Sequence, residues 1–131
     1  MRKLIILITA MAAITACNSV KEEDNSEVAL QTAKAYYDLL LTERYDDFVA
    51  GMAGTDSIDS TYHEQMVANT ALFVEAQNQF HKGMVSFTPV RAERDSTLQC
   101  INALLSVTFA DSTRETISVP MIERNGVWYM K

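Results

Sequence analysis

Two histidines, His63 and His81, are the side chains best suited to acid–base or metal chemistry near neutral pH. Both fall on one predicted helix, 18 positions apart. At 1.5 Å per residue this spacing separates them by roughly 27 Å, so they cannot share a metal ion or a substrate atom. We expect His63 to be exposed in the first turns of the helix. We expect His81 to be partly exposed and to complement the helix C-terminus.

Four aspartates, Asp46, Asp47, Asp56 and Asp59, could offer oxygen ligands to a cation. A calcium loop needs such ligands at alternating positions, followed by a glycine and a distal glutamate. Ile58 stands where the next ligand would be, and no such glycine follows. We therefore interpret these residues as acids at helix N-termini, which the helix macrodipole favours. The sequence also contains no HExxH, GxSxG, P-loop or CxxC pattern, so it predicts no metal, no cofactor and no catalytic residue.

The two cysteines, Cys17 and Cys100, have different sequence surroundings. Cys100 lies in an apolar segment and is predicted to be a small buried residue of a strand. A nucleophilic thiol would need a base placed beside it, and no local pattern supplies one. Cys17 instead ends an apolar run that begins close to the N-terminus.

The first 17 residues have the layout of a secretory signal peptide, with a basic start, an apolar run over 4–13 and small residues before Cys17. The segment Ile14-Thr15-Ala16-Cys17 resembles the lipobox of bacterial lipoproteins. That resemblance implies cleavage before Cys17, a diacylglycerol on its sulfur and an acyl chain (such as palmitate) on its new amino group. An ordinary secretory signal cut at Ala13 or Ala16 is the alternative. A transmembrane helix is disfavoured because it needs ~20 apolar residues, and polar residues follow the run at once.

These features divide the chain into a signal peptide over 1–16, a lipidated tether over 17–25 and a single domain over 26–131. Loss of Arg2 and Lys3 with the signal changes the formal charge from −6 to −8. Such an acidic chain has no basic surface for nucleic acid. We therefore expect membrane attachment through the lipid anchor alone, in the bacterial cell envelope and at the outer membrane. Lys21-Glu22-Glu23-Asp24 resembles the export signal of some surface lipoproteins, but it is equally a solvated linker, so the membrane face stays open.

Helical spacing dominates the first part of the domain. A first helix is predicted after Ser26 as N-cap, and a short second helix runs from Tyr45 to Met52. Asp56, Ser57, Asp59 and Ser60 lie at the start of a third helix, which stops at Lys82-Gly83. Four side chains trace one apolar face of this third helix: Tyr62, Met66, Phe73 and Phe80.

From Met84 the period changes to two, and four strands are predicted over Met84–Arg94, Leu98–Phe109, Arg114–Arg124 and Val127–Lys131. Asn125-Gly126 is a strong signal for a two-residue hairpin turn. The turn pairs Arg124 with Val127 and places Pro120 opposite the final residue, where its missing N–H matters little. Pro89 needs an edge strand or a bulge.

This order of elements resembles the nuclear transport factor 2-like superfamily, in particular its small bacterial lipoproteins. The residues that carry the resemblance are Ala35–Leu40 with Tyr45–Phe48, and Val119–Tyr129 around Asn-Gly-x-Trp. It implies an α+β fold of three N-terminal helices packed on a curled four-stranded antiparallel meander sheet. It also implies a cone-shaped pocket that different members use for isomerisation, dehydration or docking.

Aromatic and polar side chains could line such a cone, because Tyr and Trp combine an apolar body with a polar tip. The candidate pocket residues are Tyr36, Tyr37, Tyr62, Phe87, Asn102 and Trp128. Their alternative role is to fill the core. Asn102 shares one strand face with Ser106, and that face lies either in a solvated cone or on open surface.

The sequence is compatible with two functions. One is a non-catalytic envelope lipoprotein that binds a protein or a small hydrophobic ligand. The other is a small acid–base enzyme, isomerase-like or dehydratase-like, that works in the cone. A cone filled by side chains favours the first, and a buried acid or base with a shifted pKa favours the second.

Overall fold

The computed structural model describes residues 25–131. The predicted signal peptide, Cys17 and all of the tether except Asn25 lie outside the described residues. Within them, no helix has the length and apolar character needed to cross a membrane. Residues 25–41 are helical, so Ser26 lies inside the N-terminal helix and the prediction that it is the N-cap is wrong.

Three further helical elements follow the N-terminal helix: α2 (Tyr45–Ala50), the 3-10 turn η1 (Thr55–Ser57) and α3 (Ser60–His81). Asp46 and Asp47 lie in the first turn of α2. Asp59 is the N-cap of α3, and its Oδ1 accepts the N–H of Tyr62 at 2.8 Å. Asp56 lies in the first turn of η1, so all four predicted acids lie at helix N-termini as expected.

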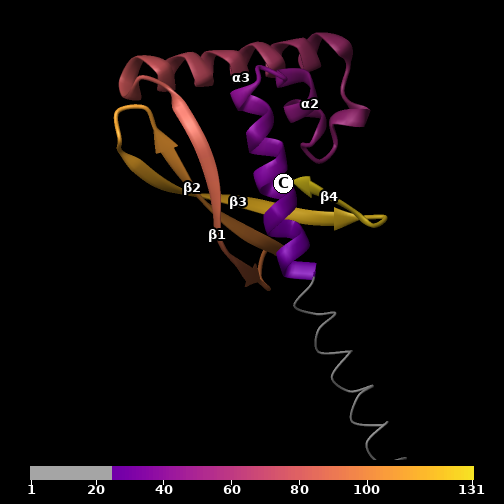
Figure 1. The fold of residues 1–131 in the computed structure, drawn as a ribbon. Helices are drawn as coiled ribbons and strands as arrows, with labels where there is room; N and C mark the ends of the chain where they lie inside the picture. The colour runs from indigo at the N-terminus through magenta and orange to yellow at the C-terminus, as the bar shows by residue number, and fades with distance from the viewer. Residues whose placement is uncertain (1–24) are drawn as a thin grey trace, which may run out of the picture.

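The sheet is a four-stranded antiparallel meander in the order β1 (Met84–Asp95), β2 (Cys100–Phe109), β3 (Arg114–Arg124) and β4 (Val127–Met130). The N-terminal helix crosses one face of this curved, open sheet, and α3 runs across its far end (Figure 1). The α+β prediction of three helices on a four-stranded meander is confirmed, and the sheet does not close on itself.

The β3–β4 hairpin has the predicted register, with Arg124 opposite Val127 and Glu123 opposite Trp128. Asn125 and Gly126 form its turn with φ of 54° and 80°. The N–H of Lys131 donates to the carbonyl of Pro120 at 2.8 Å, which places this proline where no N–H is missed. Pro89 sits on the edge strand β1 beside a register shift, so both predicted accommodations of Pro89 occur together.

The core fills the space between the helices and the inner face of the sheet. Alternate residues of β2 point into it and are buried: Ile101, Ala103, Leu105, Val107 and Phe109. Leu105, Met121 and Val49 have no exposed surface, and Leu40 is 2% exposed. The interior that could have been an open cone is therefore occupied by side chains.

The helix α3 is rotated relative to the apolar face that the sequence suggests. Met66 of the predicted face is half-buried, as are Ala71 and Ala76. The other buried or half-buried side chains of α3 are His63, Val67, Thr70, Val74, Gln77 and His81. This set is the predicted apolar face displaced by one residue, a rotation of about 100°. At the two ends of the helix, Asp59 caps the start and His81 contacts the β2–β3 turn. Tyr62, Phe73 and Phe80 are left 53%, 48% and 77% exposed.

The N-terminal helix packs closely against α2 and β4 at a contact that we call the joint, formed by Tyr36, Gly51, Trp128 and Met130. The hydroxyl of Tyr36 donates to the carbonyl of Trp128 at 2.6 Å. The N–H of Met130 donates to the carbonyl of Gly51 at 2.8 Å. The ring of Tyr36 lies so close to Gly51 that a Cβ there would come within 2.5 Å of its Cε1 atom. Glycine is therefore required at this position by a close approach and not by its φ of −78°.

Candidate functional site

The strongest candidate site is a cavity of ≈ 490 Å³ at one end of the sheet, which we call the mouth cavity. Ile101 of β2 and Met121 of β3, which are register partners, line it beside Trp128 of β4. Arg94 and Asp95 at the end of β1 lie on its rim. The cavity therefore opens where β1 passes into β2, beside the first described residue of the N-terminal helix.

The rim of the mouth cavity is held in shape by the carboxylate of Asp95. Its Oδ1 accepts the backbone N–H of Thr97 at 3.1 Å and that of Leu98 at 3.0 Å. The ammonium of Lys131 donates to the carbonyl of Leu98 at 3.2 Å. These bonds tie the β1–β2 turn to the chain terminus, so the mouth cavity has a preformed polar edge over an apolar floor.

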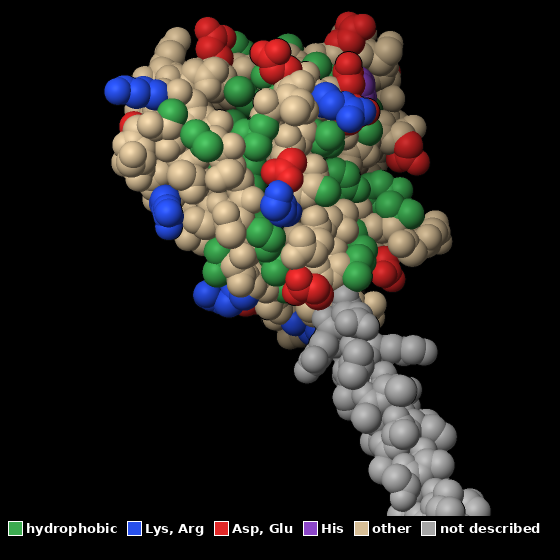
Figure 2. All heavy atoms as spheres, in the orientation of Figure 1, with side chains coloured by type: hydrophobic (Ala, Val, Ile, Leu, Met, Phe, Trp, Pro, Cys, Tyr) green, Lys and Arg blue, Asp and Glu red, His purple; other side chains and the backbone are tan. Residues whose placement is uncertain are grey.

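The charged side chains around the mouth cavity are of both signs. Arg94 is positively charged, and Asp95 and Glu123 are negatively charged. Asn25, Ser96 and Gln99 add neutral polar groups. On the face shown in Figure 2, charged side chains of both signs are interspersed with hydrophobic ones, and no large area carries a single sign. The mouth cavity thus favours a ligand with an apolar body and a polar end of little net charge.

Cys100 also lines the mouth cavity but is 5% exposed. The prediction of a small buried residue is confirmed. Its Sγ lies 3.8 Å from Oδ1 of Asn102, an amide that cannot act as a base for the thiol. The geometry at Cys100 therefore does not match an activated nucleophile, which needs a base within hydrogen-bond reach.

The six candidate pocket residues are spread over the molecule. Trp128 lines the mouth cavity. Tyr36 does not line it, but its hydroxyl donates a hydrogen bond to the carbonyl of Trp128. Tyr37 and Phe87 pack edge to face in the core, with ring centroids 5.4 Å apart. Tyr62 lies on α3, away from them.

Asn102 lies on the face of β2 opposite the core, between its register partners Glu93 and Pro120. Of the two placements that the sequence left open, the structure therefore shows the outer surface. Burial, followed by the neighbouring Tyr129, raises the pKa of Tyr36, and burial raises the pKa of Tyr37. Both phenols therefore stay neutral near pH 7.

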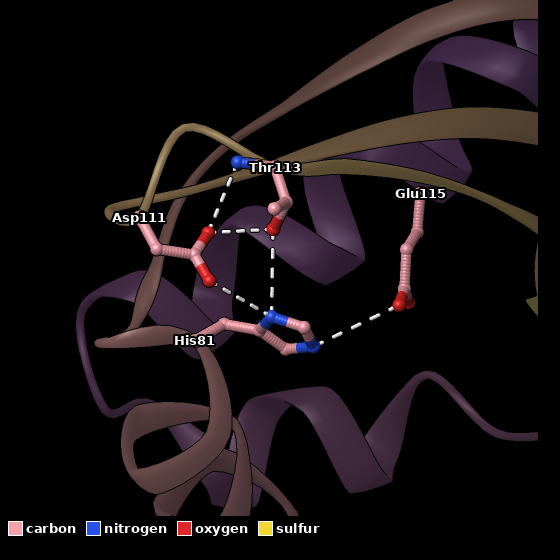
Figure 3. A network of polar contacts seen from close by, with 4 residues as sticks. All are labelled: His81, Asp111, Thr113 and Glu115. Atoms are coloured by element: carbon pink, nitrogen blue, oxygen red, sulfur yellow. Dashed lines mark hydrogen bonds and ion pairs between the residues drawn. The ribbon is translucent and has the colours of Figure 1, made fainter.

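The most connected polar cluster lies at the other end of the sheet, around His81 (Figure 3). Its Nδ1 lies 3.1 Å from Oδ2 of Asp111, and its Nε2 lies 3.7 Å from Oε1 of Glu115. The imidazole also stacks on Phe109 with ring centroids 4.2 Å apart. His81 is partly exposed at the C-terminus of α3 as predicted, and the cluster adds partners from the β2–β3 turn that come from a distant part of the sequence.

The His81 cluster resembles a catalytic dyad in composition but not in arrangement. Thr113 donates its hydroxyl to Oδ1 of Asp111 at 2.5 Å and its N–H to the same atom at 3.0 Å. The Thr113 hydroxyl, followed by its N–H and by His81, lowers the pKa of Asp111 to about 2. Nδ1 of His81 also lies 3.4 Å from the Thr113 hydroxyl. That hydroxyl donates its proton to Asp111 instead, so His81 is not placed as its general base. We interpret the cluster as a clip that fastens α3 to the sheet.

The remaining candidates for acid–base or metal chemistry lie apart. His63 lines a second cavity of ≈ 420 Å³ together with Asp56 and Tyr129. Over residues 25–131, no three His, Cys, Asp or Glu side chains are grouped in a way that could hold a metal ion. Of the residues that line the mouth cavity, Trp128 is a candidate pocket residue of the sequence analysis. The others could not be recognised, because the walls come from four segments that only the folded sheet brings together.

The chain resembles one solved structure in its fold. That structure is a protein from Campylobacter jejuni, provisionally described as an NTF2-like transpeptidase, and it superposes with a TM-score of 0.54. The match covers 76% of this chain and 94% of the other, at 11% sequence identity. No protein-family profile matches the sequence, and neither does any curated protein. At this identity the similarity shows the NTF2-like fold and nothing of the activity.

Proposed function

We propose that this protein is a non-catalytic binding module of the bacterial cell envelope, anchored by lipid on Cys17, which holds a small amphipathic ligand in the mouth cavity. The filled interior carries this proposal, because an enzyme of this fold would need reactive groups inside the cone. Leu105 and Met121 occupy that space with no exposed surface. We assign the ligand to the mouth cavity, which lies at the end of the sheet beside the N-terminal helix.

The lining of the mouth cavity supports an amphipathic ligand. The half-buried side chains of Ile122 and Trp128 offer apolar contact. The buried residues Ile101 and Met121 lie beneath them. Arg94 and Glu123 can engage a polar end of either sign. A zwitterionic or neutral headgroup on an apolar chain satisfies both parts of the site.

The position of the mouth cavity supports a role beside the membrane. Asn25 lines the cavity, and it follows Cys17 by eight residues. A chain of that length spans at most about 29 Å. With lipid on Cys17, the cavity would stay within that distance of the membrane surface, where amphipathic molecules are concentrated.

The enzyme alternative has weaker support. The description of the Campylobacter jejuni protein suggests acyl transfer, which requires a nucleophile beside a base. In this chain Cys100 is the thiol at the mouth cavity, and its Sγ contacts Asn102 instead. In the described part of the chain, the one group with a strongly lowered pKa is Asp111, whose hydrogen bonds to Thr113 and His81 hold the turn at the opposite end of the sheet.

The indole of Trp128 provides a direct test, because it is the single tryptophan of the chain. Titration with a zwitterionic single-chain amphiphile should shift its emission and saturate. Ser96 lines the mouth cavity whereas its exposed neighbour Thr97 does not. Ser96→Phe should abolish the response, and Thr97→Phe should preserve it. An unsaturable response, or an equal response in both variants, would refute binding in the cavity.

A further inference from the structure

An apolar stripe on α3 is left uncovered in the single chain. The stripe consists of Tyr62, Met66, Phe73 and Phe80, and three of these side chains are 53%, 48% and 77% exposed. Leu72 lies next to it and is 62% exposed. Soluble monomers rarely expose apolar side chains so close together, and such a surface marks an interaction site.

The spacing of the stripe is that of a helix–helix seam. With Asn69 and Ala76 included, its positions are 62, 66, 69, 73, 76 and 80, which alternate steps of four and three. This is the repeat by which two helices interlock side chains along a common seam. All residues from Gln65 to Val74 are uncharged. The seam is roughly 27 Å long at 1.5 Å per residue.

We propose that the stripe binds a second copy of this chain, with the two α3 helices antiparallel about a twofold axis. The two capping residues of α3 carry opposite charge, because Asp59 caps its start and Lys82 caps its end. An antiparallel pair brings Lys82 of one copy level with Asp59 of the other and opposes the two helix dipoles. A parallel pair would place acid beside acid at one end.

A groove beside the stripe gives the second copy a place to insert side chains. It has a volume of ≈ 350 Å³ and lies between Met66 and Phe73 of α3 and the side chains of Tyr37, Phe48 and Met52. In the antiparallel pair, Phe73 of the second copy lies level with Asn69, which also lines the groove. A central aromatic side chain that enters an apolar pocket is the usual anchor of an interface.

The direction of the stripe fits two copies attached to one membrane. The stripe is rotated by about 100° from the inward face of α3, so it points sideways relative to the sheet. In Figure 1, α3 lies across one end of the domain and the described chain enters at the other. A twofold axis along this direction keeps both N-terminal ends on one side. This agreement rests on the proposed lipid anchor, whereas the dimer itself does not.

Sedimentation over a wide concentration range tests the dimer. The wild-type protein should show a reversible change from monomer to twice the monomer mass. Phe73→Asp should raise the dissociation constant at least about tenfold, because it places a charge at the centre of the seam. Val90→Asp is the matched control, since Val90 is 47% exposed on β1 and away from α3. Thermal unfolding of each variant shows that the fold is retained.

Cross-linking distinguishes the antiparallel arrangement from its alternatives. About a twofold axis at position 71, Asn69 lies roughly 6 Å along the seam from its copy, and Gln79 lies roughly 24 Å from its copy. In a chain that carries both Cys17→Ala and Cys100→Ala, Asn69→Cys should form a dimer with a short bis-maleimide in intact cells, and Gln79→Cys should not. Equal cross-linking at both positions, a monomer at all concentrations, or cross-linking to a different protein would overturn the proposal.

Discussion

Replacement of Gly51 by alanine tests the joint between the N-terminal helix, α2 and β4. The φ of Gly51 is −78°, which alanine adopts without strain. On backbone entropy alone, Gly51→Ala would therefore stabilise the protein by about 0.4–1 kcal/mol. The added Cβ, however, would lie 2.5 Å from Cε1, 2.6 Å from Cδ1 and 2.9 Å from Cζ of Tyr36. Normal contacts between carbon atoms are about 3.5–4.0 Å.

The ring of Tyr36 cannot move aside freely, because its hydroxyl donates to the Trp128 carbonyl at 2.6 Å. Overpacking of this kind costs about 1–3 kcal/mol, and the entropic gain offsets part of it. We expect a net loss of ~1–2 kcal/mol. For a domain of this size, each kcal/mol lowers the melting temperature by about 4–8 °C. Urea unfolding with an unchanged m-value would measure the loss as a shift in midpoint.

A double-mutant cycle with Tyr36→Ala isolates the contact. Without the ring, Gly51→Ala should become neutral or stabilising, so the two substitutions together should be less harmful than their sum. An equal effect of Gly51→Ala in both backgrounds would refute the joint. So would a wild-type midpoint for the single variant.

Further predictions concern the turn, the clip and the anchor. Gly126→Val should destabilise by about 1–3 kcal/mol in thermal unfolding, because φ is 80° there, whereas Gly126→Asn should lose less. The pKa of Asp111 is lowered to about 2 in the folded protein, so its stabilising contribution is present above about pH 4 and is lost as the pH falls towards 2. The melting temperature of the wild-type protein should therefore fall more between pH 4 and pH 2 than that of Thr113→Val. Thr113→Ser should behave like the wild type. Cys17→Ser should remove the lipid mass and leave either unprocessed precursor or a soluble product, and unchanged membrane partitioning together with unchanged mass would exclude the anchor.

Local signals were sufficient for most of the fold. The change from helical to alternating spacing at Met84 and the Asn125-Gly126 turn depend on neighbouring residues alone, so the sequence predicted β3 and the β3–β4 register correctly. The rotation of α3 could not be predicted in this way. It is accompanied by the contact of His81 with Asp111, which is 30 positions away, and the apolar pattern of Tyr62, Phe73 and Phe80 contains no signal for that contact.

The candidate site was less accessible to sequence reasoning. Trp128 was identified from its residue type, and the structure places it in the mouth cavity. Ile101, Met121 and Arg94 were not identified, because apolar strand residues beside a cavity have the same pattern as those in a filled core. Their role follows only from the register that brings the ends of β1, β2 and β3 together.

The most direct test of the central claim is native mass spectrometry of the protein purified from its own envelope. We expect a bound small amphipathic molecule on the wild-type protein and on Thr97→Phe, and its loss from Ser96→Phe. The absence of a bound molecule from all three proteins would contradict a binding function at the mouth cavity. Full retention of the ligand by Ser96→Phe would contradict it as well.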